Sequence, residues 1–181
     1  APSPPLLFMG EEWHCRNPFL FFCDFEPGLA EAVTAGRRKE FARFERFSDP
    51  AVRERIPDPA AHETFLASRL NWDDQHQPDH QTWLRHYQQL LALRHQEITP
   101  CLARQENTAA DFQLLDKCGL LANWRLDDGC ELHLLANAGE EPLAFSEKLL
   151  PGRQIYASPA ITSASSSNYL PPWSVLWFIH P

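Results

Sequence analysis

The spacing of hydrophobic residues changes near residue 100. Before that point, apolar side chains three or four positions apart predict helices over 29–47 and 80–97, with a short helix around Phe65 and Leu66. The second long helix carries one stripe through Trp83, Tyr87 and Leu90, and Asp79 suits its N-cap. After residue 100, apolar and polar residues alternate over 120–126 and 132–136, a further strand segment is expected at 154–157 after a turn, and a last apolar run covers 174–179. This half therefore reads as a small antiparallel β-domain.

Turn signals separate the predicted strands. Asp127-Asp128-Gly129 is typical of a tight hairpin turn, and Pro151-Gly152 marks a second turn. A serine-rich loop is predicted over 158–168.

The N-terminal segment predicts a different kind of strand. Residues 5–9 are continuously apolar and Gly10 ends the run, as in a strand buried on both faces of a parallel sheet. Glu11, Glu12 and Trp13 follow at its carboxyl end, where ligand sites of α/β folds gather. An aromatic-rich loop then covers 14–28.

Charge and cysteine content exclude several classes of partner and site. The 181 residues carry a net charge of −8, which argues against nucleic acid and anionic membranes as partners. No apolar run reaches the roughly 18 residues of a membrane span, and residues 1–9 do not read as a signal peptide. Five widely spaced cysteines support neither a disulfide framework nor a zinc ribbon, so we expect a reducing, cytoplasmic setting.

Three kinds of candidate site remain, each with a structural alternative. Glu11 and Glu12 are neighbours that point apart in an extended chain, so sugar binding or loop bracing is favoured over acid and nucleophile roles. Asp24 is a third carboxylate near the strand end. His76 and His80 have zinc-ligand spacing, but Pro78 between them favours a polar loop, and no metal is expected. Aromatic side chains could form a sugar-stacking platform or simply pack the core: Trp13, Phe19, Phe21, Phe22 and Phe25.

The string from Pro5 to Trp13, PLLFMGEEW, resembles the segment at the eighth barrel strand of α-amylase-superfamily glycosidases. A longer series of landmarks, in the same order along the chain, is similar to the malto-oligosyltrehalose trehalohydrolase family within it. These landmarks are Pro18–Phe22 with Asp24, Gly36–Phe41, Pro57–Pro59 with Thr64-Phe65, Ser68–Trp72, Trp124–Leu126 and Pro172–Val175.

The resemblance implies an α+β fold in two parts. Residues 1–100 would be the terminal strand and helices of a (β/α)8 barrel with a helical insertion, and residues 101–181 a small antiparallel C-terminal β-sheet or sandwich domain. The family hydrolyses the α-1,4 bond next to the trehalose end of maltooligosyltrehalose and needs no cofactor. Its three catalytic carboxylates would precede residue 1, so this chain would lack the N-terminal barrel and be inactive alone. The substrate-binding residues implied here are Glu12, Trp13, Phe19, Phe21, Phe22 and Asp24.

Two further hypotheses stay open. The chain could be a non-catalytic glucan-binding or interaction β-domain with a helical appendage, or a remnant with no separate function. If it is a fragment, the apolar run at 5–9 would lack its neighbouring strands, and we expect self-association, rearrangement or disorder of residues 1–30.

Overall fold

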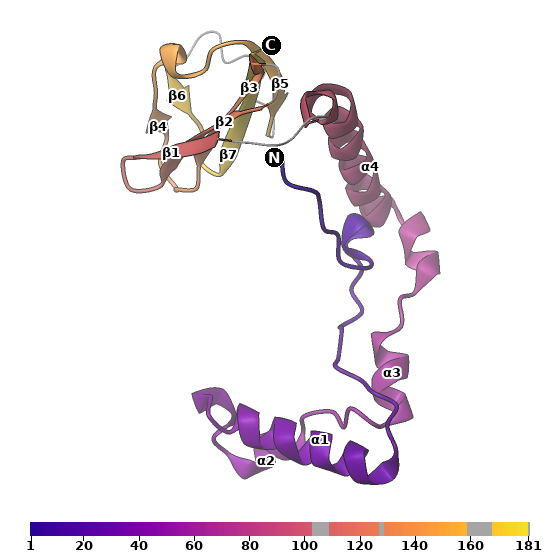
Figure 1. The fold of residues 1–181 in the computed structure, drawn as a ribbon. Coiled ribbons are helices and arrows are strands. Elements are labelled where there is room, and N and C mark those ends of the chain that lie inside the picture. Colours follow the sequence, from indigo (N-terminus) through magenta and orange to yellow (C-terminus); the bar gives the residue numbers. More distant parts are fainter. Residues whose placement is uncertain (103–108, 127–128, 159–167, 181) are drawn as a thin grey trace. The chain divides into compact units, whose positions relative to one another are not determined.

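The computed structural model describes residues 1–102, 109–126, 129–158 and 168–180 (Figure 1). These residues form two compact units. The first comprises Leu7–Tyr87, and the second comprises Ala1–Leu6 with Gln88–Pro181. The predicted hairpin turn at Asp127-Asp128 and most of the predicted serine-rich loop lie outside the described residues.

Short helices dominate the first unit. They are α1 (Pro27–Phe41), α2 (Pro50–Glu54) and α3 (His62–Ser68), with 3-10 turns at Glu11–Trp13, Glu45–Phe47 and Trp72–His76. The helix predicted over 29–47 therefore ends six residues early. Its last predicted residue, Phe47, instead folds back so that its ring lies 5.3 Å from the ring of Phe41. The periodic phenylalanines pack on one another across a break in the helix.

Helix α4 (Pro78–Leu93) confirms most of the helix predicted over 80–97. It starts at Pro78, whose fixed φ suits the first helical position, so Asp79 lies in the first turn and is not the cap. The backbone continues through a π-helical turn, Arg94–Ile98, and a 3-10 turn, Thr99–Leu102. Arg94 joins this turn to the N-terminus, because its guanidinium donates to the carbonyl oxygens of Pro2 and Ser3 at 3.0 and 3.1 Å.

Residues 5–9 do not form the buried strand that their apolar run predicts. Residues 5–8 belong to no helix or strand and Met9 lies in a turn, with 41% of Leu7, 51% of Phe8 and 46% of Met9 accessible to solvent. A strand needs a hydrogen-bonded neighbour, and no strand among the described residues pairs with this segment. The prediction of burial was therefore wrong for this structure.

The second unit contains an antiparallel sheet in the order β1-β2-β3-β7-β5. Its strands β2, β3, β5 and β7 confirm the four predicted strand segments, and β1 was not foreseen. A separate two-stranded ladder pairs β4 with β6. The bounds are β1 (Ala109–Leu115), β2 (Gly119–Arg125), β3 (Glu131–Asn137), β4 (Leu143–Ala144), β5 (Arg153–Ala157), β6 (Tyr169–Leu170) and β7 (Ser174–His180).

Both faces of this sheet carry a hydrophobic cluster. Leu132 and Leu135 are fully buried and lie three residues apart on β3, so they point to opposite faces. Leu135 belongs to a cluster with Leu121 and Leu176, covered by residues near β4 and β6. Leu132 belongs to a cluster with Leu126, Cys130, Ile179 and Ile98, the last from the π-helical turn. Helices followed by a small antiparallel sheet confirm the predicted α+β class.

Among the helices of the described residues, none combines the length and apolar character needed to cross a membrane.

Candidate functional site

The predicted site begins with a tight turn from Phe8 to Cys15. The N–H of Glu11 donates to the carbonyl of Phe8 at 3.0 Å, and that of Cys15 donates to the carbonyl of Gly10 at 2.8 Å. Gly10 has φ +86°, and a Cβ there would lie 2.8 Å from the Cβ of Cys15. The turn therefore requires glycine at this position.

Trp13 anchors the turn in the interior. Its side chain is 2% exposed and its ring lies 5.1 Å from that of Trp72. Its carbonyl oxygen lies 2.6 Å from Nδ1 of buried His80 on α4. Because a carbonyl only accepts, His80 carries its proton on Nδ1 and donates it here. The buried turn is thus tied to α4 by a polar contact.

Glu11 links the same turn to α4 at a second position, Tyr87. One carboxylate oxygen accepts the N–H of Phe8 at 2.9 Å, and the other accepts the hydroxyl of Tyr87 at 3.2 Å. Desolvation, and after it the negative charges of Glu11 and Glu12, raises the pKa of Tyr87, so the hydroxyl stays protonated and donates. Both oxygens of Glu11 are thus occupied in bracing the turn.

A cavity of about 300 Å³ opens beside this contact. Its polar lining includes Glu11, His14 and Asn17, and its aromatic lining includes Trp83 and Tyr87. Trp83 is 45% exposed, and the ring of His14 lies 5.2 Å from it. A few polar groups beside accessible aromatic rings are what small-molecule sites present.

The loop that carries the predicted phenylalanines is held by two of the landmark segments. The N–H of Leu20 donates to the hydroxyl of Ser68 at 3.0 Å, and the N–H of Cys23 donates to the carbonyl of Pro59 at 2.9 Å. Thr64 in turn donates to the carbonyl of Asp58 at 2.6 Å. These landmarks therefore interlock in space, although 48 positions separate Leu20 from Ser68.

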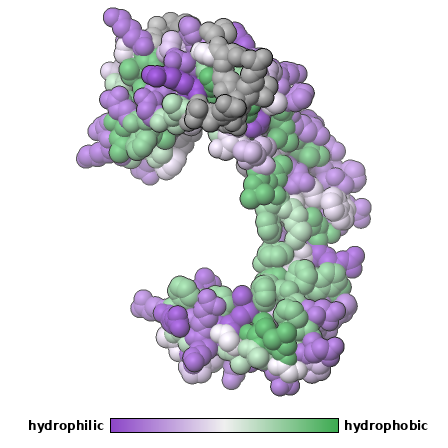
Figure 2. All heavy atoms as spheres, viewed as in Figure 1, coloured by the Kyte–Doolittle hydropathy of each residue, from purple (hydrophilic) through white to green (hydrophobic). Residues whose placement is uncertain are grey.

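Part of this loop contributes to an exposed aromatic strip. The ring of Phe19 lies 5.1 Å from Phe8 and 6.1 Å from Phe22, and Phe22 lies 5.3 Å from Phe65. All four side chains are between 37% and 53% exposed. Figure 2 shows hydrophobic residues at the surface along the N-terminal segment that precedes this loop.

The structure brings together only some of the predicted site residues. Phe19 and Phe22 share the aromatic strip, Glu12 is half-buried within the turn, and Asp24 is exposed. Trp13 is buried and presents no ring face to a ligand, so its side chain packs in the core. Phe21 lies under the guanidinium of Arg37 at 4.3 Å and lines, together with Phe19, another cavity of about 470 Å³.

Sequence reasoning missed the contribution of α4. The sequence pattern places Trp83 and Tyr87 on one helical stripe and gives them no role in a ligand site, yet both line the cavity. Their spacing of four residues signals a shared helix face but not what that face contacts. His80 was considered as a zinc ligand, whereas it binds the Trp13 carbonyl. Among the described residues, no group of three or more His, Cys, Asp or Glu could hold a metal ion.

Comparison with known sequences identifies the proteins that this chain resembles. Residues 107–177 match a family described as a domain of unknown function, DUF3459. The malto-oligosyltrehalose trehalohydrolase of Deinococcus radiodurans is 40% identical over 154 residues, which cover 83% of this chain and 24% of that protein. The enzyme of the same name from Arthrobacter ramosus is 43% identical over 106 residues, covering 58% of this chain and 18% of that one.

A solved structure shares the fold. The crystal structure titled as a putative alpha amylase from Salmonella typhimurium is 35% identical, with a TM-score of 0.80 over 98% of this chain and 28% of that chain. This chain thus spans about a quarter of the length of the proteins it matches. The resemblance drawn from the landmarks is confirmed: this chain is a relative of the malto-oligosyltrehalose trehalohydrolases, which it matches over part of their length.

Proposed function

We propose that this chain is the C-terminal portion of a glycoside hydrolase in trehalose biosynthesis. The intact enzyme would cleave the α-1,4-glucosidic bond next to the trehalose end of maltooligosyltrehalose and release trehalose. The observation that carries the proposal is the match to several proteins named malto-oligosyltrehalose trehalohydrolase, with 34% to 43% identity in four of them.

The geometry of the turn suggests how this chain would serve such a reaction. The cavity beside Glu11 offers aromatic faces and hydrogen-bonding groups, which suit the C–H faces and the hydroxyls of a glucose ring. Asp24 is exposed and Glu12 is half-buried, and the carboxylate of each suits sugar hydroxyls, while Phe19 and Phe22 offer exposed rings. Trp13 would act indirectly, by fixing the turn that positions Glu12 and His14.

We assign substrate binding, and not bond cleavage, to these residues. Retaining hydrolysis needs one carboxyl group as nucleophile and another as acid and base, on opposite sides of the scissile bond. Glu11 is instead occupied on both oxygens by Phe8 and Tyr87. The reacting carboxylates would be supplied by the remaining three-quarters of the enzyme, and this chain alone would be inactive.

A chimera tests the proposal directly. This chain would replace the matching segment of the Deinococcus radiodurans relative, and trehalose release from maltooligosyltrehalose would be measured by product analysis. We expect the chimera to release trehalose and the 181-residue chain alone to release none. A chimera that folds, shown by an unchanged melting transition, but yields no trehalose would contradict the proposal, as would hydrolysis by the chain alone.

A second pair of chimeras tests the role of the aromatic strip. Phe22→Ala removes a ring of the strip that is 37% exposed, whereas Leu29→Ala removes an apolar side chain on α1 that is 53% exposed. We expect the first substitution to raise KM for the oligosaccharide and the second to leave it unchanged, because ring stacking on sugar contributes to binding. Equal KM values would remove Phe22 from the proposed binding surface.

A further inference from the structure

A polar cavity lies on the sheet of the second unit, remote in sequence from the turn described above. It measures about 490 Å³ and is lined by strands β1, β2 and β3 together with Lys148 and Leu149. This volume falls within the range of small-molecule sites, roughly 300–1,000 Å³. Six polar residues from the three strands line it: Asp111, Gln113, Asn123, Arg125, Glu131 and His133.

The strand register explains why these residues meet. Asp111 lies opposite Asn123, which lies opposite His133, and Arg125 lies opposite Glu131. Alternate residues of a strand share a face, so this polar set shares its face with Leu121 and Leu135. One end of the face thus holds a hydrophobic cluster and the other end holds polar groups.

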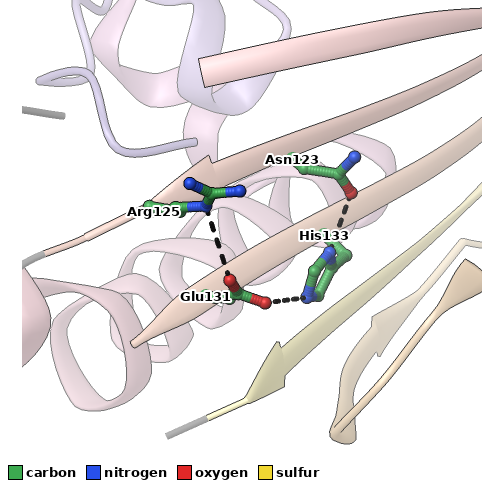
Figure 3. Close-up of polar contacts among 4 residues, drawn as sticks. All are labelled: Asn123, Arg125, Glu131 and His133. Atoms are coloured by element: carbon green, nitrogen blue, oxygen red, sulfur yellow. Dashed lines mark hydrogen bonds and ion pairs between the residues drawn. The ribbon is translucent and has the colours of Figure 1, made fainter. Parts of the chain in front are cut away.

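His133 is the central member of the set (Figure 3). It is 5% exposed, and its Nδ1 lies 2.8 Å from the carboxamide oxygen of Asn123. Because that oxygen accepts, the ring proton is on Nδ1. Nε2 is buried and has no hydrogen-bond partner within the described part of the chain. The nearest carboxylate oxygen, of Glu131, lies 3.7 Å away, beyond hydrogen-bond distance.

The network around His133 is therefore incomplete. Glu131 is likewise 3.7 Å from Nε of Arg125, which is itself 78% exposed. A buried polar atom without a partner costs about 1–3 kcal/mol. An arrangement that keeps such an atom at the wall of a cavity is poorly suited to packing and well suited to binding a ligand that completes the hydrogen bonds.

The charges around the cavity indicate which ligand fits. Asp111 and Glu131 balance Arg125 and Lys148, so an anion would meet two carboxylates and a cation would meet two positive groups. Hydroxyl groups donate and accept, and so match a mixed lining. Trp124 also lines the cavity, and one face of its ring is taken up by stacking on Trp177 at 5.5 Å.

We propose that this cavity binds a neutral polyhydroxylated ligand, a saccharide. One ligand hydroxyl donates to Nε2 of His133, a neighbouring hydroxyl donates to Glu131 and accepts from Arg125, and a third hydroxyl donates to the carboxylate of Asp111 at the edge strand. Burial lowers the pKa of His133, although Glu131 opposes the shift, so the ring is neutral near pH 7 and Nε2 can accept. The site requires no bond cleavage and does not depend on the hydrolase function proposed above. Only the choice of a glucan as the probe rests on that proposed function.

Nuclear magnetic resonance on the labelled 181-residue chain tests this inference. Maltotriose at millimolar concentration is expected to shift backbone amides of the strand segments that line the cavity and the Nε2 resonance of His133. Asp111→Ala is expected to weaken binding about tenfold, as for loss of a hydrogen bond to a charged group. Phe112→Ala is the matched control, since Phe112 neighbours Asp111 on the same edge strand, is 73% exposed and points to the other face.

Inorganic phosphate is the counter-probe. Shifts produced by phosphate and not by maltotriose would overturn the proposal in favour of an anion site. No shifts with maltotriose would overturn it, as would equal affinities of the Asp111→Ala and Phe112→Ala chains. Glu131→Gln keeps the shape of the cavity and provides a second variant with the same expected loss. Saccharide binding is measured from the resonances of the β-domain, whereas the hydrolase function is measured from the trehalose produced. Either proposal can therefore fail without the other.

Discussion

Nδ1 of His80 donates a hydrogen bond of 2.6 Å to the carbonyl oxygen of Trp13, joining α4 to a turn 67 positions earlier in the chain. Both residues are buried, so water cannot replace either partner. Removing the imidazole would leave a buried carbonyl without a donor.

We therefore expect His80→Ala to lower the free energy of unfolding by about 1–3 kcal/mol. Urea denaturation followed by tryptophan fluorescence measures this change. His76→Ala is the control, because His76 is exposed in the preceding 3-10 turn and should change stability little. Equal unfolding midpoints for the two variants would show that the bond contributes nothing.

Two glycines should respond to alanine with opposite signs. Gly10 has φ +86° and its added Cβ would lie 2.8 Å from Cys15 and 2.9 Å from Leu70, so Gly10→Ala should destabilise by about 1–3 kcal/mol. Gly36 lies within α1 with nothing inside 4 Å of an added Cβ, so Gly36→Ala should stabilise by about 0.5–1 kcal/mol. Thermal melting compares them, and a shift of the same sign in both variants would contradict the interpretation.

Acid should destabilise the β-domain through His133. Burial lowers its folded-state pKa below the ordinary value of 6.5. The unfolded chain therefore takes up a proton first as the pH falls, so the contribution of His133 to stability is lost below about pH 6.5. Glu131 and Asp111 counter the shift and His180 reinforces it, while Arg125 and Lys148 also line the cavity.

The measurement is the unfolding free energy between about pH 7 and about pH 5, in the original chain and in His133→Gln. The variant should lose less stability over this range, since it has no imidazole to protonate. Parallel curves for the two chains would show that His133 is not responsible.

Asp58 should titrate at unusually low pH. The N–H of Ala60 and, after it, the hydroxyl of Thr34 donate to its carboxylate and lower its pKa from the ordinary 3.8. Carbon-detected resonance titration is expected to show a midpoint below that value, and Thr34→Val should move the midpoint part of the way back. A midpoint unaffected by Thr34→Val would show that the hydroxyl does not act on the carboxylate.

The exposed apolar segment 7–9 should promote self-association. Contiguous exposed apolar residues favour contacts between copies, so sedimentation velocity should show a coefficient that rises with concentration. Replacing Leu7 and Met9 by Gln should reduce this rise, whereas Leu29→Gln on α1 should not. A compact monomer at all concentrations, with this segment protected from proteolysis, would contradict the prediction.

The spacing of apolar residues along the chain predicted helix α4 and the inner strands of the sheet. The stripe through Trp83 and Tyr87 defines α4, and alternation defines β2 and β3, because their side chains are sorted between two environments. Strand β1 was missed because it is an edge strand whose apolar residues, Phe112 and Leu114, are 73% and 69% exposed. Its sequence carries no clean alternation of burial to detect.

The two candidate sites depend on burial and on contacts between residues far apart in the chain, which the sequence pattern does not reveal. The aromatic residues near Trp13 were identified, but burial separated Trp13 from Phe19 only in three dimensions. The cavity around His133 follows from cross-strand register, which sets Asn123 and Glu131 beside it. Residues 5–9 show the same limit, since an apolar run indicates a tendency to be buried but does not provide the partner strands.

The position of β7 also affects how the β-domain is made. Strands β3 and β5 do not pair with each other; each pairs with β7, which comes after both in the chain. During synthesis, the ribosome would therefore have to release residues 174–180 before the sheet could close. Until then β5 has no partner and Leu135 lacks its cross-strand neighbour Leu176. Closure of this sheet is therefore expected to be a late step in folding, and the domain stays sensitive to chaperones until β7 has paired with both strands.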